Sequence, residues 1–231
     1  MSFGQNVQFL RKMHRGMTQE ELAEQMNVSR QTVSKWELDA AFPEMEKAIA
    51  LAKLFSCSID ELLQGDLNSG NEAYINIRQE VVEGFTYACY VVISCDPEGD
   101  SQEHITKWAK RHGIDDPQMI GWDFPFLSQE QINVYHMHGY AAACILPEGF
   151  DTKCEDMRIV SQPSHAYAAI TIKDPFAAPF VLIPNAYKTL MRYMDVNAMK
   201  HKESKEIASC FEKVYETDGV TYMDVYIAME A

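Results

Sequence analysis

Apolar residues recur at helical spacing through the first quarter of the chain, and this pattern predicts a series of short helices. Val7, Leu10 and Met13 fall on one face of the first of them, and Gly16 then ends it. The same spacing returns four more times before the pattern changes. The predicted helices cover residues 5–15, 18–26, 29–37, 43–55 and 58–63, and together they indicate one compact all-α domain.

Polar residues at the ends of these stretches support the helix boundaries. Thr18 with Glu21, and Ser58 with Glu61, have the spacing of capping boxes, in which hydroxyl and carboxylate satisfy free backbone N–H groups. Ser29 is a favoured N-cap residue, and Asn27 tolerates the positive φ that a tight turn between helices requires. The stretch from 18 to 37 therefore predicts two helices joined by a tight turn.

The second of these two helices has the amphipathic pattern of a DNA reader. Val33 and Trp36 point toward the core, so the polar side chains occupy the open side. Polar side chains near the start of such a helix reach base edges in the major groove, and amides and cations also contact phosphates. The predicted DNA-binding residues are Gln19, Ser29, Arg30, Gln31, Thr32, Ser34 and Lys35. The alternative is a helical protein-interaction module.

After the polar, glycine-bearing run 64–71, the pattern changes from helical to extended. We therefore predict a helix-turn-helix domain over residues 1–66, a linker over 67–73 and a second domain over 74–231. Within the second domain the pattern predicts strands at 74–82, 85–93, 119–124, 134–145, 157–160, 165–172, 210–215 and 220–229, and helices at 100–112 and 180–194.

These elements form a weak internal repeat. Each half reads strand, strand, helix, strand, strand, and the pairs Tyr87-Ala88 and Tyr167-Ala168 occupy matching places. The expected fold is a five-helix bundle followed by an α+β domain of two duplicated units. Their antiparallel sheets would join around a central groove.

The negative charge of the chain is distributed unevenly along the sequence. The chain has 20 Lys and Arg against 34 Asp and Glu, a net charge of −14, yet residues 1–66 hold seven basic and ten acidic side chains. A nearly neutral reader attached to an acidic body confines DNA contact to one face, and an acidic body suits a cationic ligand. The chain has no signal-peptide pattern, no membrane-spanning run and no CxxC pair, so we expect a cytoplasmic protein with free thiols.

Several aromatic residues and one acid are candidates for the ligand site. Glu212 stands between apolar neighbours, where a carboxylate is costly to bury without a counter-charge that a ligand cation could supply. The alternatives are an exposed strand glutamate and ordinary aromatic core packing. The full predicted set is Trp122, Phe124, Tyr140, Tyr187, Glu212 and Tyr226.

Catalysis and metal binding receive little support. His136 and His138 would share one face of a strand, but two imidazoles alone do not make a metal site. No GxSxG, Walker or HExxH signature occurs. We expect no metal, no cofactor and no catalytic residues.

Residues 5–63 resemble the Cro/C1-type (XRE) helix-turn-helix domain. They carry TQEELA at 18–23, TVSKWE at 32–37, Pro43 and IDELL at 59–63. The resemblance implies operator binding as a homodimer, with base and phosphate contacts from Gln31 to Lys35 and a phosphate contact from Gln19. Residues 38–40 depart from the family pattern, which implies less backbone contact from that loop.

Residues 74–231 more loosely resemble the GyrI-like effector-binding domain found on other regulators. The duplicated order, the Tyr-Ala strands and the closing CFE at 210–212 carry this resemblance. It implies an apolar, often cationic effector in a central groove with Glu212 facing it. Two alternatives come with it: a GyrI-like small-molecule hydrolase, and a protein-binding module that takes a partner such as a gyrase subunit.

Overall fold

The computed structural model describes residues 2–65, 67, 73–154 and 156–230. Within these residues the chain divides into two compact units. Unit 1 comprises residues 1–78, 170–201 and 230, and unit 2 comprises residues 79–169, 202–229 and 231, in each case as far as the structure describes them. The predicted linker falls largely on residues 68–72, outside the described residues.

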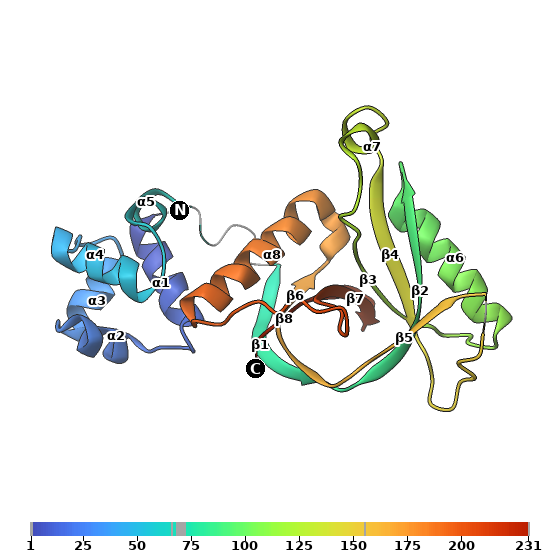
Figure 1. The fold of residues 1–231 in the computed structure, drawn as a ribbon. Coiled ribbons are helices and arrows are strands. Elements are labelled where there is room, and N and C mark those ends of the chain that lie inside the picture. The colour runs from blue at the N-terminus through green and yellow to red at the C-terminus, as the bar shows by residue number, and fades with distance from the viewer. Residues whose placement is uncertain (1, 66, 68–72, 155, 231) are drawn as a thin grey trace. The chain divides into compact units, whose positions relative to one another are not determined.

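The five predicted helices of the N-terminal region are present (Figure 1). Local side chains set their ends as the sequence predicts. Ser29 accepts a hydrogen bond from the Thr32 amide, and the Thr18–Glu21 box is formed. Asn27 turns the chain between the second and third helices at φ 49°. The helices are α1 (Phe3–Met13), α2 (Gln19–Met26), α3 (Arg30–Glu37), α4 (Met45–Leu54) and α5 (Ile59–Gln64).

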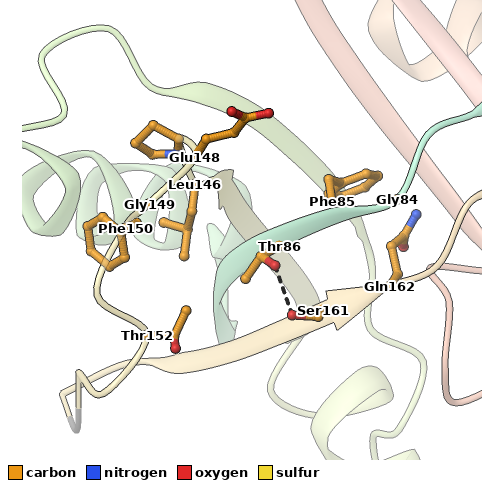
Figure 2. A pocket seen from close by; sticks show the side chains of 11 residues that line it. Gly84, Phe85, Thr86, Leu146, Glu148, Gly149, Phe150, Thr152, Ser161 and Gln162 are labelled. Atoms are coloured by element: carbon orange, nitrogen blue, oxygen red, sulfur yellow. Dashed lines mark hydrogen bonds between the residues drawn. The ribbon is translucent and has the colours of Figure 1, made fainter.

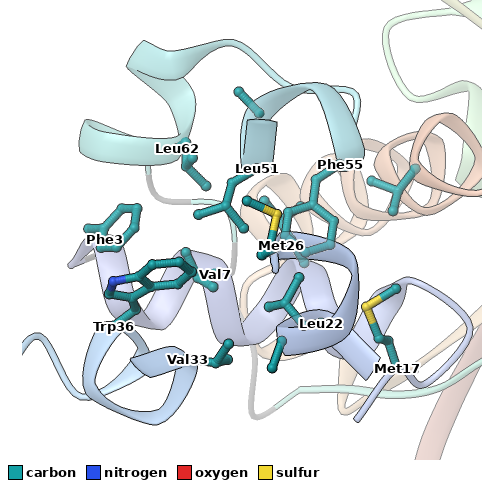
Figure 3. Close-up of a cluster of buried hydrophobic side chains, with 14 residues drawn as sticks. Phe3, Val7, Met17, Leu22, Met26, Val33, Trp36, Leu51, Phe55 and Leu62 are labelled. Carbon is teal, nitrogen blue, oxygen red and sulfur yellow. The ribbon is translucent and has the colours of Figure 1, made fainter. Parts of the chain in front are cut away.

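The core of this helical region is a single cluster of buried apolar side chains (Figure 3). Leu10, Leu22 and Phe55 are completely inaccessible to solvent, and the indole of Trp36 is nearly so. Because burial of one such side chain contributes about 1.5–3 kcal/mol, this cluster holds the short helices together. Val196, which lies far along the sequence, belongs to the same cluster.

Eight strands form one sheet in the part of the chain that the structure describes. Their order is β1-β6-β8-β7-β3-β4-β2-β5, and every pair with a defined register is antiparallel. The strands are β1 (Tyr74–Val82), β2 (Phe85–Ser94), β3 (Gln118–Asp123), β4 (His138–Ile145), β5 (Arg158–Gln162), β6 (His165–Lys173), β7 (Cys210–Thr217) and β8 (Val220–Ala228).

The strand order has the internal symmetry that the repeat predicts. The trios β6-β8-β7 and β3-β4-β2 mirror each other across the β7–β3 pair, where Gly121 faces Glu212. The outer strands are exchanged, since β1 lies beside β6 of the second repeat and β5 beside β2 of the first. The predicted fold class, a helical bundle followed by a duplicated α+β region, is confirmed.

The two faces of the sheet in unit 2 have separate apolar clusters. On one face Tyr140 and Cys144 pack with Ile105 and Trp108 of α6 (Pro97–Arg111). The neighbouring strand residues point the other way and join a second cluster rich in aromatic rings. Helix α7 (Gln129–Asn133), the 3-10 turn η1 (Pro175–Ala177) and α8 (Pro179–Val196) complete the described elements.

The structure corrects three sequence predictions. Helix α6 begins at Pro97, not near residue 100, because Asp96 caps it and proline is tolerated at the first helical position. The predicted strand 134–145 begins only at His138, since α7 and a turn precede it. His136 has φ 52° in that turn, so it does not share a strand face with His138.

None of the helices in the described part of the chain has the length and apolar character that a membrane span requires.

Candidate nucleic-acid interface and ligand-binding surfaces

The predicted DNA-binding residues lie along α3, from its N-cap Ser29 to Lys35, and at the start of α2. Arg30, Gln31 and Lys35 are exposed on α3, whereas Val33 and Trp36 of the same helix are buried. Thr32 and Ser34 are half-buried, and the hydroxyls of Ser29 and Thr32 lie 2.9 Å apart. The helix thus presents one polar face from a firmly anchored position, which is the geometry that a groove-reading helix requires.

A buried charge network sets the position of α3, and sequence reasoning missed it. Arg11, on α1, is buried, and its Nε lies 2.5 Å from Glu37 Oε1. The Gln19 amide donates to the other oxygen, Glu37 Oε2, at 2.8 Å. One carboxylate at the end of α3 therefore ties together α1, α2 and α3. The predicted phosphate contact, Gln19, is oriented by this carboxylate.

Two further contacts involve charged side chains near α3. Arg30 lies 2.8 Å from Glu20, and both side chains are largely exposed, so the pair contributes little stability and leaves Arg30 accessible. Asp39 is exposed, and its Oδ1 accepts a hydrogen bond from the Gly4 amide at 2.8 Å. The loop after α3 thus caps the start of α1, a local role that the departure from the family pattern did not reveal.

Helix α8 lies in the same compact unit as the helical region, although it comes from the second half of the sequence. Val196 sits in the core cluster, and the Asn197 side-chain amide donates to the Met13 carbonyl at 3.1 Å. Arg192 forms an ion pair with Glu61 of α5, and this pairing lowers the pKa of Glu61 to about 2. The sequence boundary at residue 74 therefore does not follow the compact units, because α8 packs with the N-terminal helices.

Two of the predicted ligand residues meet on the α6 face of the sheet. The Tyr140 hydroxyl donates to Glu212 at 3.3 Å, next to Gly121, where a Cβ would come within 2.1 Å of that hydroxyl. Burial, followed by the negative charges of Glu212 and Glu98, raises the pKa of Tyr140. The phenol therefore stays protonated and serves as a hydrogen-bond donor to Glu212.

Two others lie on the opposite face. Trp122 and Tyr226 belong to a cluster of six rings with centroid separations from 4.5 to 6.3 Å. Strand alternation explains the separation, since Phe211 joins this cluster and Glu212, next to it in sequence, must point away. We define these rings as the aromatic face. Its members are Phe85, Tyr87, Trp122, Tyr167, Phe211 and Tyr226.

The remaining two predicted residues are Phe124 and Tyr187. Phe124 follows β3, and its ring packs against Phe126 at 5.3 Å. Tyr187 is on α8, which belongs to unit 1. Within unit 2, the Tyr140–Glu212 hydrogen bond joins two of the predicted residues directly, and Trp122 and Tyr226 belong to the aromatic face.

A pocket of about 480 Å³ opens at a different place, between β2, β5 and the loop after β4 (Figure 2). Phe85, Leu146 and Phe150 give it apolar walls, Glu148 adds a carboxylate, and the hydroxyls of Thr86 and Ser161 lie 2.8 Å apart. None of the six predicted ligand residues lines it. Sequence reasoning missed this pocket because strand pairing, not a local motif, creates it.

Comparisons with known proteins point to the N-terminal region. Residues 7–62 match the helix-turn-helix family model. The HTH-type transcriptional activator BcrR of Enterococcus faecalis is 47% identical over 66 residues, which are 29% of this chain and 32% of BcrR. Repressor protein C2 of Salmonella phage P22 is 32% identical over 108 residues, which are 47% of each protein.

A solved structure of EcmrR bound to DNA is similar at lower identity. The match has 9% identity and a TM-score of 0.47, and it covers 90% of this chain and 97% of that chain. The chain spans about a third of BcrR and about half of the C2 repressor. Over residues 7–62 this chain is therefore similar to the helix-turn-helix domains of known transcription regulators.

Proposed function

We propose that this protein is a sequence-specific transcription regulator whose helix α3 reads an operator. The observation that carries the proposal is the exposed row Arg30, Gln31 and Lys35 on a helix anchored by Val33 and Trp36. The two curated relatives are named as an activator and a repressor, and this supports a regulator rather than an enzyme. A DNA reader acts in the cytoplasm, where bacterial DNA lies, and this location is part of the proposal.

The reader binds its operator as a homodimer. Residues 1–66 are close to electrically neutral, so one copy gains little from phosphate attraction. Two copies joined in a dimer gain affinity because the second contact becomes intramolecular. The half-sites then lie one helical turn apart, about 34–36 Å.

The DNA-binding proposal is tested with a duplex that the full chain selects from a random-sequence pool. Arg30→Ala together with Gln31→Ala should lower affinity for this duplex at least about 10-fold in a gel shift, because the loss of one base contact costs about 1–3 kcal/mol. Lys53→Ala with Gln64→Ala is the matched control, since it likewise removes one cation and one amide, from exposed positions on α4 and α5. Equal affinities of the two double variants would refute the assignment.

We infer that the effector is an apolar cation that binds beside Tyr140 and Glu212. A half-buried carboxylate at the centre of the sheet, partnered by a phenol, attracts a cation, and Asp123 lies on the same face opposite Tyr140. Glu212→Gln should weaken binding of a rhodamine-type cationic dye, measured by fluorescence anisotropy. Glu216→Gln is the control because Glu216 is exposed on the same strand.

A rival location on the aromatic face makes the experiment sharper. Trp122 is half-buried there and its ring could take a cation by cation–π contact. Trp122→Leu should therefore leave dye affinity nearly unchanged if the effector binds beside Glu212. Loss of binding in Trp122→Leu with normal binding in Glu212→Gln would move the effector to the aromatic face and overturn our assignment.

Helix α8 is the proposed route from effector to reader. It follows β6 in sequence and contacts the helical core through Val196, Arg192 and Asn197. An effector shifts DNA affinity only if it binds one conformation of the protein more tightly than another. Arg192→Ala should reduce the dye-induced change in DNA affinity more than Lys188→Ala, an exposed position on the same helix. An equal response in both variants would exclude the Arg192 contact from the route.

A further inference from the structure

Three side chains with metal-binding atoms converge at the end of α6, outside the surfaces described above. His112 is the C-cap of α6, and Cys154 and Asp156 come from the segment that leads into β5. Their ligand atoms all lie within 4.8 Å of one another. We propose that His112, Cys154 and Asp156 bind a single Zn²⁺-class divalent cation.

The distances suit such an ion. His112 Nε2 lies 3.5 Å from Asp156 Oδ2 and 3.8 Å from Cys154 Sγ. Ligands of a tetrahedral zinc, at bond lengths of about 2.0–2.3 Å, are separated by roughly 3.4–3.6 Å. The Cys154 thiol donates a hydrogen bond to Asp156. A bound cation replaces this proton, because cysteine ligates as the thiolate, and the two side chains then move apart around the ion.

The surroundings hold two of the three ligands in place. The Trp108 indole N–H donates to Asp156 Oδ1 at 3.1 Å, the kind of outer contact that orients a metal ligand. The rings of Trp108 and Phe150 pack around His112, with centroids 4.6 and 6.1 Å away. This packing fixes the imidazole plane while its Nε2 faces Cys154 and Asp156.

The donor types and exposure select the class of ion. One thiolate, one imidazole and one carboxylate suit zinc or cobalt and disfavour magnesium and calcium, which prefer oxygen ligands. His112 and Asp156 are both exposed, so water can complete a four-coordinate shell.

The ion would join the end of α6 to the segment before β5. Phe150 lies between this cluster and the pocket, because its ring packs on His112 and also lines the cavity (Figure 2). Metal binding therefore fixes one wall of that pocket. This consequence does not depend on the proposed DNA-binding function.

The test uses the full chain, stripped with a chelator and titrated with Co²⁺ under reducing conditions. We expect one equivalent to bind with a thiolate-to-cobalt charge-transfer absorption band, and Zn²⁺ to displace it. Cys154→Ser should abolish that band and weaken affinity at least about 100-fold, since loss of an outer contact alone costs about 10–100-fold. His112→Ala should weaken affinity similarly.

Two variants complete the experiment. Cys95→Ser removes an exposed thiol that is not part of the cluster, so it should keep both the band and the affinity. Trp108→Phe keeps an aromatic ring but removes the hydrogen bond to Asp156, so affinity should fall about 10–100-fold. Circular dichroism checks that each variant folds. Absence of one-equivalent binding, or unchanged binding in Cys154→Ser, would overturn the proposal.

Discussion

The buried ion pair between Arg11 and Glu37 offers the sharpest test of how the reader is held together. The side chains of Arg11 and Glu37 are 10% and 1% exposed. The Glu37 carboxylate accepts hydrogen bonds from Arg11 Nε at 2.5 Å, from Arg11 Nη2 at 3.2 Å and from the Gln19 amide at 2.8 Å. Glu37→Gln keeps the shape but removes the charge. Its new amide group must also face donors of Arg11.

The expected cost follows from this geometry. Breaking a buried pair leaves an uncompensated charge and costs about 3–5 kcal/mol. A helical domain of this size has a total stability of roughly 3–10 kcal/mol, so the variant loses a large share of it. The exposed pair of Arg30 and Glu20 provides the control, because Glu20→Gln should change stability by less than about 1 kcal/mol.

Urea denaturation followed by far-ultraviolet circular dichroism measures both variants. A double replacement, Arg11→Met with Glu37→Leu, separates the charge effect from packing, since apolar residues in place of a buried pair are often neutral or stabilising. We expect the double variant to be more stable than Glu37→Gln. If Glu37→Gln and Glu20→Gln cost the same, the pair does not anchor α3 and our reasoning fails.

Two further predictions concern the ion pair of Arg192 with Glu61 and the crowded backbone position of Gly121. Pairing with Arg192 lowers the pKa of Glu61 from 4.5 to about 2, so its stabilisation is present above about pH 4.5 and is lost as pH falls toward 2. The melting-temperature difference between wild type and Glu61→Gln should therefore shrink in acid, and a constant difference would contradict it. Gly121→Ala should destabilise the protein by about 1–3 kcal/mol, because its Cβ would meet the Tyr140 hydroxyl at 2.1 Å. Tyr140→Phe, which only removes a hydrogen bond, should cost about 1 kcal/mol, and an equal cost for both would argue against steric conflict.

Local signals predicted much of the fold. Thr18, Ser29 and Ser58 cap helices where expected, and Asn27 adopts the positive φ that the turn requires. Each of these effects acts within about four residues, so the sequence displays it directly. The alternation in the strands and the order of the repeat follow from the same kind of short-range pattern. The Asp96 cap of α6 is not evident from the sequence, because an Asp-Pro pair is equally typical of a turn.

Long-range placement was not predictable in the same way. Arg11 and Glu37 are 26 residues apart, and nothing near either one reveals the partner that makes burial tolerable. Glu212 was predicted to share a ligand site with Trp122, but the two point to opposite faces of the sheet. A short strand pattern cannot tell which side of a sheet will be covered.

Short-range sequence patterns alone predicted the two helices and the tight turn over residues 18–37, with Arg30, Gln31 and Lys35 on the open side. Helix periodicity and capping act over a few residues and set where these helices begin and end. The helices then need only the apolar core cluster to pack together. The tertiary structure decided what the rest of the chain brings together. It packed α8 against the reader and placed His112 beside Cys154 and Asp156. Such juxtapositions depend on strand order and packing between distant segments, and no local sequence pattern carries that information.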